Sequence, residues 1–440
     1  MRHRSVINEP RVTLDPAEVR NRDRRYVWHP WSPLTADRTQ LMVSHGDGAR
    51  VWDIYGKEYI DASSLNSTCG YAHPQLASAI HQQLLRLHGL DISVASHELA
   101  GLLAERLASY LPGTLSKTLF VNSGSEGLEA AVLIAHSYWS HVGVARSRVV
   151  AFASGYHGST TMSRSLSALP RVCHPFRAPL PVTYVELPVA PGELRRPESL
   201  NLLLSGFEQA LGSDPHDPPI AVIVEPFLNV GGGIVLPTGF LRGLRELCDA
   251  TGTLLLLDEV FTGYGRTGRM FAFQREAAEP DILVSSKGLG GGYLPIGAVT
   301  VQQGIYDSFA KEPVIGGLRY GHTTSGHAGA CAAALATLDV LEKEHLVDQA
   351  DRFGVSLLER FAPVAGTNDV VDVRGLGLLL VLEMSSVGVA TQLMKRARDN
   401  GLLLRQHGQV LMAVPPLTID GEGVAVLANR LERSIAADDS

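Results

Sequence analysis

The stretch Asp281-Ile-Leu-Val-Ser-Ser-Lys287-Gly-Leu-Gly-Gly-Gly292 joins a short apolar strand to a glycine-rich turn. The strand brings the lone amine of Lys287 into a turn that has almost no bulky side chains. A second apolar run, Leu254-Leu-Leu-Leu-Asp258, ends abruptly in a carboxylate. An acid at the end of a buried strand needs a cationic partner. The two strand ends therefore indicate a site in which an amine and an acid act together.

A lysine that can form a Schiff base, with an acid that can pair with a pyridinium nitrogen, is the minimal equipment of a pyridoxal-phosphate enzyme. Each residue alone has an ordinary alternative, since Asp258 could be a helix N-cap and Lys287 could be a surface lysine. The chemical interpretation therefore depends on whether other parts of the chain agree with it.

Around this pair, apolar strands alternate with amphipathic helices. We predict helices from 125 onward, at 200–211 and at 240–251, and strands at 117–122, 148–153, 220–225, 253–258 and 282–286. Such alternation implies an α/β fold, with a mostly parallel sheet that carries helices on both faces.

The two ends of the chain show a different pattern. A polar arm extends to about residue 25, and the alternation of apolar and polar residues at 50–61 predicts a hairpin. After residue 325, helices precede short strands near 371–383 and 402–414. We predict that 1–75 and 326–440 together build a smaller α+β domain, and that 76–325 form a large cofactor-binding domain.

Composition excludes several classes of protein. The 440 residues carry a net charge of -7 and are 45% hydrophobic, which fits a globular protein and not a general nucleic-acid binder. The four cysteines are scattered without metal-ligand spacing, so we expect no metal site and a reducing compartment. No apolar run is long enough to span a membrane, and we expect a cytoplasmic protein.

The segment Val121-Asn-Ser-Gly124-Ser125-Glu-Gly is the predicted phosphate site. A strand there runs into small residues that open a helix, so backbone N–H groups and the helix dipole point at one spot. Taken alone, such a sequence is more often an N-cap without a ligand.

The segment Gly155-Tyr156-His157-Gly158 follows the strand that ends near residue 153. Ligands of open α/β sheets bind at such strand ends, and Tyr156 could stack on a pyridine ring. A loop tyrosine alone is more often a packing residue. The order of phosphate turn, aromatic residue, acid and lysine along the chain favours the cofactor interpretation.

With these motifs in hand, the chain resembles the class III aminotransferases, a subgroup of the fold-type I pyridoxal-phosphate enzymes. The resemblance covers nearly the whole chain and rests on several turns in fixed order. The matching stretches are NSGSEGLEAA, YHG, IVEP, LDEVFTGYGRTGRM, SSKGLGGGYLPIGA, GHTTSGHAGACAAAL and VRGLGLLLVLE.

The resemblance implies a role for each matching residue. Lys287 would carry the Schiff base with pyridoxal 5'-phosphate and later move a proton between substrate and cofactor. Asp258 would pair with the pyridine nitrogen and keep it protonated. Gly124 and Ser125 would bind the phosphate, and Tyr156 would cover one face of the ring.

Val260 would cover the other face of the ring, and His157 would shape the pocket. Glu225, at the end of the IVEP strand, would be a structural acid near the cofactor. Thr323 of the GHT motif would reach the phosphate of a neighbouring subunit. The resemblance therefore implies a homodimer with active sites at its interface.

Arg405 matches the position at which many relatives bind a substrate carboxylate through a bidentate contact. The alternative is an arginine in a structural ion pair. Relatives that act on ornithine or 4-aminobutyrate carry a glutamate shortly after the Glu-Pro pair, whereas this chain has Phe-Leu-Asn-Val-Gly-Gly-Gly after Pro226. Those two activities are therefore disfavoured.

The sequence around Trp31, WHPW, is similar to that of the diaminopelargonate synthases, which also have a tryptophan pair after Ser-Ser. Here Ser63-Ser is followed by Leu-Asn66-Ser67-Thr68, which offers hydrogen-bonding groups in place of two aromatic walls. We predict Trp31 and Asn66 as pocket residues and a polar acceptor, such as an oxidised amino sugar.

The predicted reaction is a ping-pong transamination that moves an amino group from an amine donor to an aldehyde or ketone. A diaminopelargonate-synthase-like or omega-amino-acid transaminase is one alternative. Decarboxylation, intramolecular amino transfer, or a non-catalytic pyridoxal-phosphate-binding protein are others, because the lysine and the acid serve any carbanion pathway.

Overall fold

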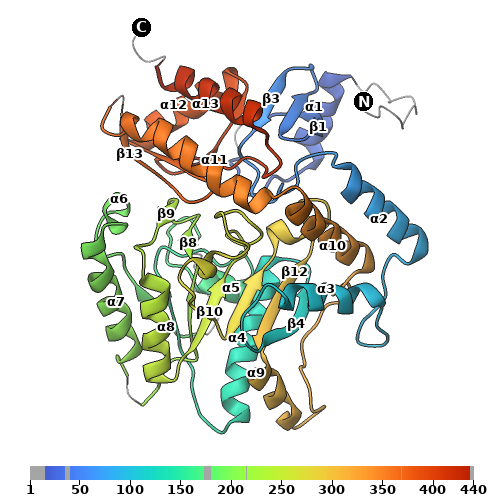
Figure 1. Cartoon of the computed structure of the whole chain (residues 1–440), viewed down its shortest axis with the longest axis vertical. Coiled ribbons are helices and arrows are strands. Elements are labelled where there is room, and N and C mark those ends of the chain that lie inside the picture. Colours follow the sequence, from blue (N-terminus) through green and yellow to red (C-terminus); the bar gives the residue numbers. More distant parts are fainter. Residues whose placement is uncertain (1–14, 35–39, 173–179, 215, 368, 437–440) are drawn as a thin grey trace.

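The computed structural model describes residues 15–34, 40–172, 180–214, 216–367 and 369–436. Its largest sheet has seven strands (Figure 1), of which β12 is antiparallel to both neighbours and the other six share one direction. The predicted, mostly parallel sheet is confirmed. In spatial order the strands are β4 (Leu115–Val121), β12 (Gly297–Gln302), β11 (Ile282–Ser285), β10 (Leu254–Asp258), β7 (Ala221–Val224), β5 (Val149–Phe152) and β6 (Val182–Val185).

Helices pack against both faces of this sheet, because its central strands are apolar on both sides. In β10, Leu254 and Leu256 join one apolar cluster with residues of α4, whereas Leu255 and Leu257 join a second cluster with residues of α7 and α8. This alternation follows from the two-residue period of a strand. The all-leucine strand is therefore held rigidly from both sides, and its terminal residue, Asp258, has a fixed position.

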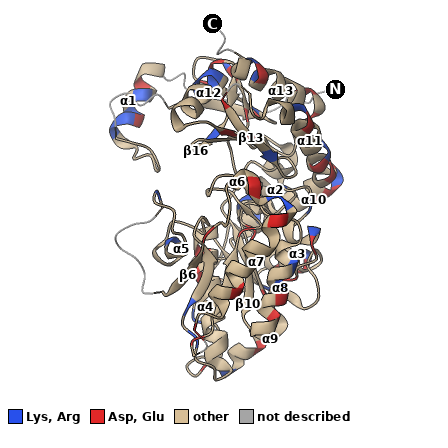
Figure 2. Ribbon diagram, turned by 90° about the vertical axis from the view of Figure 1, so that its left-hand side faces the viewer, with Lys and Arg blue, Asp and Glu red and all other residues tan. Residues whose placement is uncertain are grey.

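The longer helices carry charges of both signs on their outer surfaces (Figure 2). No helix in the described part of the chain is both long enough and apolar enough to cross a membrane. The α-helices are α1 (Pro16–Tyr26), α2 (Pro74–Arg86), α3 (Glu98–Ala108), α4 (Gly124–His141), α5 (Thr161–Ser165), α6 (Pro191–Leu194), α7 (Pro197–Leu211), α8 (Phe240–Thr251), α9 (Gln303–Ser308), α10 (Ala328–Lys343), α11 (Leu346–Phe361), α12 (Val387–Asp399) and α13 (Gly421–Ala436).

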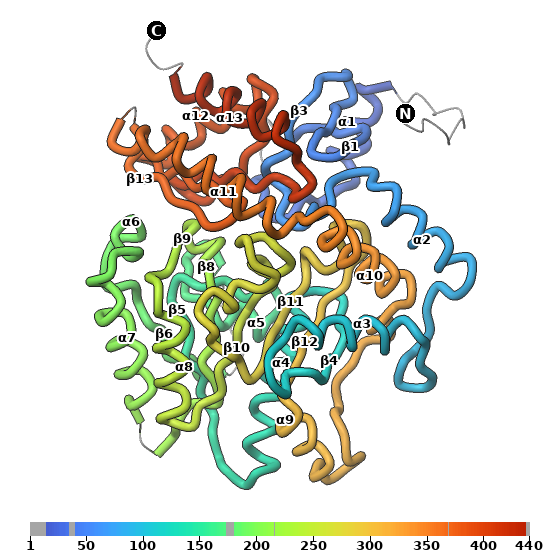
Figure 3. Tube along the Cα trace, in the orientation of Figure 1, coloured from blue at the N-terminus to red at the C-terminus, as the bar shows by residue number. Residues whose placement is uncertain are grey.

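Three smaller sheets complete the structure. The first joins both ends of the chain, as Figure 3 shows, because β15 pairs with β3 of the predicted hairpin. That hairpin is confirmed, and the domain boundaries stay a prediction. The sheets are β1 (Val43–Asp47), β2 (Arg50–Asp53), β3 (Glu58–Asp61) and β15 (Leu402–Leu403); β13 (Val370–Gly375), β14 (Leu380–Met384), β17 (Val410–Ala413) and β16 (Arg405–His407); and β8 (Phe227–Leu228) with β9 (Ile234–Val235).

Several elements were not predicted from the sequence, among them the following three. Strands β6 and β12 were missed, and the segment Pro16–Tyr26 is a helix where the sequence suggested only a polar arm. Asp15 caps this helix by accepting from the amide of Ala17 at 3.2 Å, and Pro16 occupies its first turn. An acid followed by proline is a recognisable helix start that could have revealed it. Residues 1–14 of the predicted arm lie outside the described residues.

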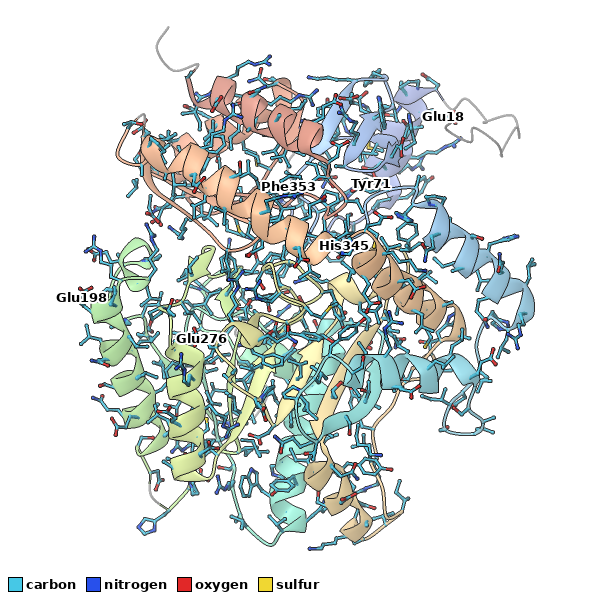
Figure 4. The ribbon with its side chains drawn as sticks, viewed as in Figure 1. Glu18, Tyr71, Glu198, Glu276, His345 and Phe353 are labelled. Atoms are coloured by element: carbon cyan, nitrogen blue, oxygen red, sulfur yellow. The ribbon has the colours of Figure 1, made fainter. Side chains whose placement is uncertain are left out.

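Glu276 closes the start of α8, the helix that leads into β10 (Figure 4). Its carboxylate accepts from the amides of Gly239 at 3.0 Å and Leu241 at 2.9 Å. Helix α8 has no side-chain cap of its own, so Glu276 satisfies N–H groups that the helix leaves free. Glu276 therefore fixes the start of the helix that precedes β10 and Asp258.

Arg374 of β13 ties the small sheet to the loop after Glu225. Its side chain is fully buried, forms ion pairs with Asp372 and Glu383, and donates to the carbonyl oxygens of Gly232 and Gly233. One guanidinium thus compensates four hydrogen-bonding groups, two carboxylates and two carbonyl oxygens, and its planar geometry suits this task.

We predict that Arg374→Met destabilises the protein by about 3–5 kcal/mol, because it removes a buried cation from two half-buried carboxylates and leaves the carbonyl oxygens of Gly232 and Gly233 without this donor. Urea unfolding followed by circular dichroism would measure this change. The matched control is Arg196→Gln, which removes an exposed arginine paired with Glu193 and should change stability by less than about 0.5 kcal/mol. Equal effects of the two substitutions would contradict the structural role of Arg374.

Candidate active site

A cavity of about 410 Å³ opens where the parallel strands of the large sheet end. Segments that follow β4, β5, β7, β10 and β11 converge there, because the carboxyl ends of parallel strands meet at one edge of a sheet. Most of the predicted site residues are brought together. Those that line the cavity are Asn66, Gly124, Ser125, Tyr156, His157, Glu225, Asp258, Val260 and Lys287.

The predicted phosphate turn lies at the start of α4. The hydroxyl of Ser123 accepts a hydrogen bond from the amide of Glu126 at 3.3 Å. Ser123 is therefore an N-cap, as the alternative interpretation of this segment expected. The turn also lines the cavity, with Gly124 pressed against Val260. A Cβ at position 124 would lie 2.7 Å from a methyl carbon of Val260, which is too close. Only glycine lets the two walls approach, and the helix start remains open to an anion.

Asp258 is buried and held by two donors. Its Oδ2 lies 2.8 Å from Nδ1 of His157, and its Oδ1 accepts from the amide of Val260 at 3.0 Å. Burial opposes protonation of His157, but the hydrogen bond and charge of Asp258 raise the pKa of His157 above its ordinary value. The predicted pocket-shaping histidine thus positions the acid, and its Nε2 is buried without a partner among the described residues.

Glu225 supports the aromatic wall. Its Oε1 accepts from the amide of Tyr156 at 2.8 Å, and its Oε2 from the amide of Asn229 at 3.4 Å. Burial, with repulsion from Asp258, raises the pKa of Glu225 to about 7, although His157 acts in the opposite direction. A buried carboxyl that accepts from two backbone amides is consistent with the predicted structural acid.

The amine of Lys287 faces the cavity at the end of β11. It lies 5.3 Å from the ring centre of Phe261, and among the described residues no hydrogen bond or salt bridge holds it. Burial lowers the pKa of Lys287, Asp258 and Glu225 oppose this, and Arg405 lowers it further. The neutral amine, which is the nucleophilic form, is therefore favoured relative to a free lysine.

One expectation about the polar wall was wrong. Of the three residues proposed to offer hydrogen bonds, only Asn66 lines the cavity, and its side-chain oxygen already accepts from Ser64 at 3.1 Å. Ser67 and Thr68 are buried behind it. The segment turns inward after Asn66 because the backbone of Thr68 bonds to Leu417.

Three predicted residues lie outside the cavity lining: Trp31, Thr323 and Arg405. Trp31 is 65% exposed, with its ring edge-on to Tyr156 at a centroid distance of 6.4 Å. Thr323 is exposed in the loop before α10. Both positions are open to contact with another molecule, and their roles stay predictions.

Arg405, on β16, does not line the cavity but is close enough to Lys287 for its charge to lower the pKa of that lysine. No carboxylate in the described part of the chain forms an ion pair with Arg405. Among those residues, Arg405 is therefore not the structural ion-pair partner that the alternative interpretation proposed. Its Nε donates to Nε2 of His407 at 3.2 Å. Burial, with the nearby charge of Arg171, lowers the pKa of Arg405. A half-buried guanidinium without a counter-ion is suited to an anionic ligand.

Sequence reasoning missed several lining residues. Phe261 follows Asp258 closely and lies under Lys287, and Ser286 fixes the lysine turn by donating to the carbonyl of Ile296 at 2.8 Å. Proximity in the motif LDEVF could have indicated Phe261. The contact of Ser286 spans the glycine-rich turn and has no signal in the local sequence.

The described residues fit pyridoxal 5'-phosphate. The cavity offers an unpaired amine, a buried acid with fixed orientation, and a helix start for a phosphate. At Gly158, which has φ +135°, a Cβ would lie 2.6 Å from Oγ of Ser125, so the backbone is compact around the phosphate turn. Such a combination of lysine, acid and anion site defines a pyridoxal-phosphate-dependent enzyme.

Comparison with known proteins agrees with this class. The family model described as aminotransferase class-III matches residues 32–435, and the chain belongs to that family. It is a pyridoxal-phosphate-dependent aminotransferase.

Similar proteins cover nearly the full length. An adenosylmethionine-8-amino-7-oxononanoate aminotransferase of Geobacter sulfurreducens is 33% identical, over 96% of this chain and 98% of that protein. An acetylornithine aminotransferase of Methanothermobacter thermautotrophicus is 34% identical, over 93% and 96%. The omega transaminase of Pseudomonas jessenii in complex with PMP has a TM-score of 0.90 at 29% identity, over 95% of this chain and 97% of that one.

We predict that Asp258→Asn lowers the rate of amino transfer by at least about a hundredfold, the size expected for removal of one preorganised charge. Single-turnover conversion of an amine donor, followed through cofactor absorbance, measures this rate. Asp249→Asn, at the exposed end of α8, is the control and should behave as the wild type. A cofactor-loaded Asp258→Asn variant with the wild-type rate would refute the assignment.

Proposed function

We propose that the protein catalyses a ping-pong transamination, in which an amine donor leaves its amino group and a polar aldehyde or ketone then collects it. An oxidised amino sugar is an example of such an acceptor. The observation that carries the proposal is the position of Lys287. Its amine faces the cavity, has a lowered pKa and has no hydrogen-bond partner among the described residues. Asp258, whose carboxylate is held by the amide of Val260, lines the same cavity.

Each side chain has a distinct task in this proposal. Lys287 attaches the cofactor and, once free, is the base that moves a proton between the substrate carbon and the cofactor. Asp258, oriented by His157, holds a proton at the pyridine nitrogen. Pyridoxal 5'-phosphate, when bound, supplies the electron sink for the carbanion. Tyr156, Val260 and the buried residues at the bottom of the cavity exclude water.

Gly124 and Ser125 bind the phosphate at the start of α4, with Thr323 contributed by a partner subunit. The exposed position of Thr323 supports this proposal of a homodimer. We also propose a cytoplasmic location, because the cysteines are dispersed along the chain.

Asn66 and Arg405 determine the substrate in this proposal. Arg405 binds a carboxylate on the donor, and Asn66 donates a hydrogen bond to a polar acceptor. The second candidate is the reaction named for the Geobacter sulfurreducens relative, which is favoured by that protein's coverage of nearly the whole chain. The two differ in the acceptor that is turned over.

We predict that borohydride reduction of the cofactor-loaded protein, followed by peptide mapping, places the label on Lys287. The reason is that reduction makes a lysine Schiff base permanent. Lys287→Gln should carry no label, and Lys117→Gln, a lysine of β4, should be labelled as the wild type is. A label on any other lysine would contradict the assignment.

We predict that Asn66→Leu raises KM for a polar carbonyl acceptor by about tenfold, the value of one lost hydrogen bond in a cavity. The rate of the donor half-reaction should not change. A panel of ketones and aldehydes, with product analysis by mass spectrometry, provides the measurement. Turnover of 8-amino-7-oxononanoate alone, the compound in the name of the Geobacter sulfurreducens relative, would reject the polar acceptor. Release of carbon dioxide would indicate decarboxylation instead.

A further inference from the structure

Ser159 lies between two side chains that line the cavity. Its amide donates to Oγ of Ser125 in the phosphate turn at 3.1 Å, and its hydroxyl shares a hydrogen bond with the hydroxyl of Tyr156 at 2.8 Å. Ser125 and Tyr156 line the cavity, whereas Ser159 is exposed and does not. No other residue in the described part of the chain is hydrogen-bonded to both of these side chains. One residue therefore joins the predicted phosphate turn to the predicted aromatic wall.

The bond from Ser159 to Ser125 orients a hydrogen-bond donor. A backbone N–H group can only donate, so Oγ of Ser125 is the acceptor in this bond. The hydroxyl proton of Ser125 therefore points away from Ser159, and it has no acceptor among the described residues. Ser125 lies in the first turn of α4, where backbone N–H groups and the helix dipole favour an anion. The amide of Ser159 thus leaves the hydroxyl of Ser125 free to donate to a phosphate oxygen.

The bond from Ser159 to Tyr156 fixes the outer end of the aromatic ring. The amide of Tyr156 donates to Oε1 of Glu225 at 2.8 Å, so the backbone of this residue is held independently. The hydroxyl of Tyr156 has no partner besides Ser159 in the described part of the chain. Without the hydroxyl of Ser159, the ring would keep its backbone anchor and lose the hydrogen bond that fixes its free end.

Ser159 is itself held in place by its neighbours in the segment. Its carbonyl oxygen accepts from Nη2 of Arg164 at 3.2 Å. The amide of Met162 donates to Oε1 of Glu129 on α4 at 3.0 Å. The segment that carries Ser159 is therefore anchored to the same helix whose first turn forms the phosphate site.

We propose that Ser159 is a positioning residue that keeps the ring of Tyr156 in register with the phosphate donor Ser125. The inference rests on the contacts with pyridoxal 5'-phosphate that the proposed function gives to these two residues. It goes beyond that function because Ser159 acts on the cofactor only through Tyr156 and Ser125. Loss of either bond of Ser159 weakens the hold on the other side chain.

The first test uses the enzyme without an amine donor. The apoenzyme is titrated with pyridoxal 5'-phosphate, and the dissociation constant and the visible circular dichroism per bound cofactor are measured. Ser159→Ala should raise the dissociation constant about fivefold, the value of one lost hydrogen bond, and should lower the dichroism because the ring of Tyr156 is less ordered. Ser159→Thr keeps the hydroxyl and should stay within about twofold of the wild type.

Thr160→Val is the matched control for a general loosening of the segment. It removes the hydroxyl of the next residue, which bonds to Ser163 and not to Tyr156. The dissociation constant should stay within about twofold of the wild type.

A double-substitution cycle tests whether the coupling passes through Ser159. Ser125→Ala and Tyr156→Phe each remove one hydroxyl that Ser159 contacts. With Ser159 present, their combined effect on the dissociation constant should be at least about threefold smaller than the product of the single effects, because the first loss already loosens Ser159. In the Ser159→Ala background, the two effects should multiply to within about twofold. Tyr156→Phe cuts the same bond as Ser159→Ala, so it replaces that variant if it fails to fold.

A Ser159→Ala variant with the dissociation constant and dichroism of the wild type would overturn the inference, as would an equal effect of Thr160→Val. So would single effects of Ser125→Ala and Tyr156→Phe that multiply fully while Ser159 is present. In each case the cofactor would still bind and amino transfer would still proceed, so the proposed function would stand. A wild-type enzyme that binds the cofactor and converts no amine donor would instead overturn the proposed function and leave the measured effect of Ser159 unchanged.

Discussion

The burial of Asp258 at the end of a leucine strand is the constraint that the rest of the site satisfies. An ionised carboxylate away from water is costly unless fixed donors surround it. The imidazole of His157 and the amide of Val260 provide those donors. Glu225, the second buried acid, receives backbone amides, and its pKa rises to about 7. Two neighbouring acids cannot both be charged at low cost, and the raised pKa of Glu225 lowers that cost.

Much of the fold could be predicted because β10, β11 and β7 are uninterrupted apolar runs that end in polar residues. Their length and their order along the chain indicate parallel strands with connecting helices. Strand β12 was missed because Gly297–Gln302 follows directly on a glycine-rich turn and contains Thr300, which bonds across to Thr118 of β4. Thr118 lies almost two hundred residues before Thr300 in the chain. The local sequence pattern of 297–302 therefore could not predict this pairing.

The cofactor half of the site was predictable for the same topological reason. Lys287, Asp258 and Glu225 each end a strand of one parallel sheet, so their meeting follows from the fold. The substrate half depends on contacts between separate sheets and loops. The chain turns inward after Asn66, and Arg405 lies on β16 of a different sheet from the strands that end at Lys287, Asp258 and Glu225. Neither fact follows from residue type or spacing.

The cofactor side and the substrate side of the site have opposite effects on the pKa of Lys287. Asp258 and Glu225 raise its pKa, whereas burial and Arg405 lower it. A carboxylate that binds Arg405 would cancel one of the lowering influences, since it neutralises the nearest cation on the substrate side. The proton affinity of the amine would then rise when the substrate arrives, which is when a free lysine has to accept a proton from it. An arginine that pairs with no acid in the described part of the chain would thus link substrate binding to the basicity of Lys287, whereas an arginine already paired with an acid could not.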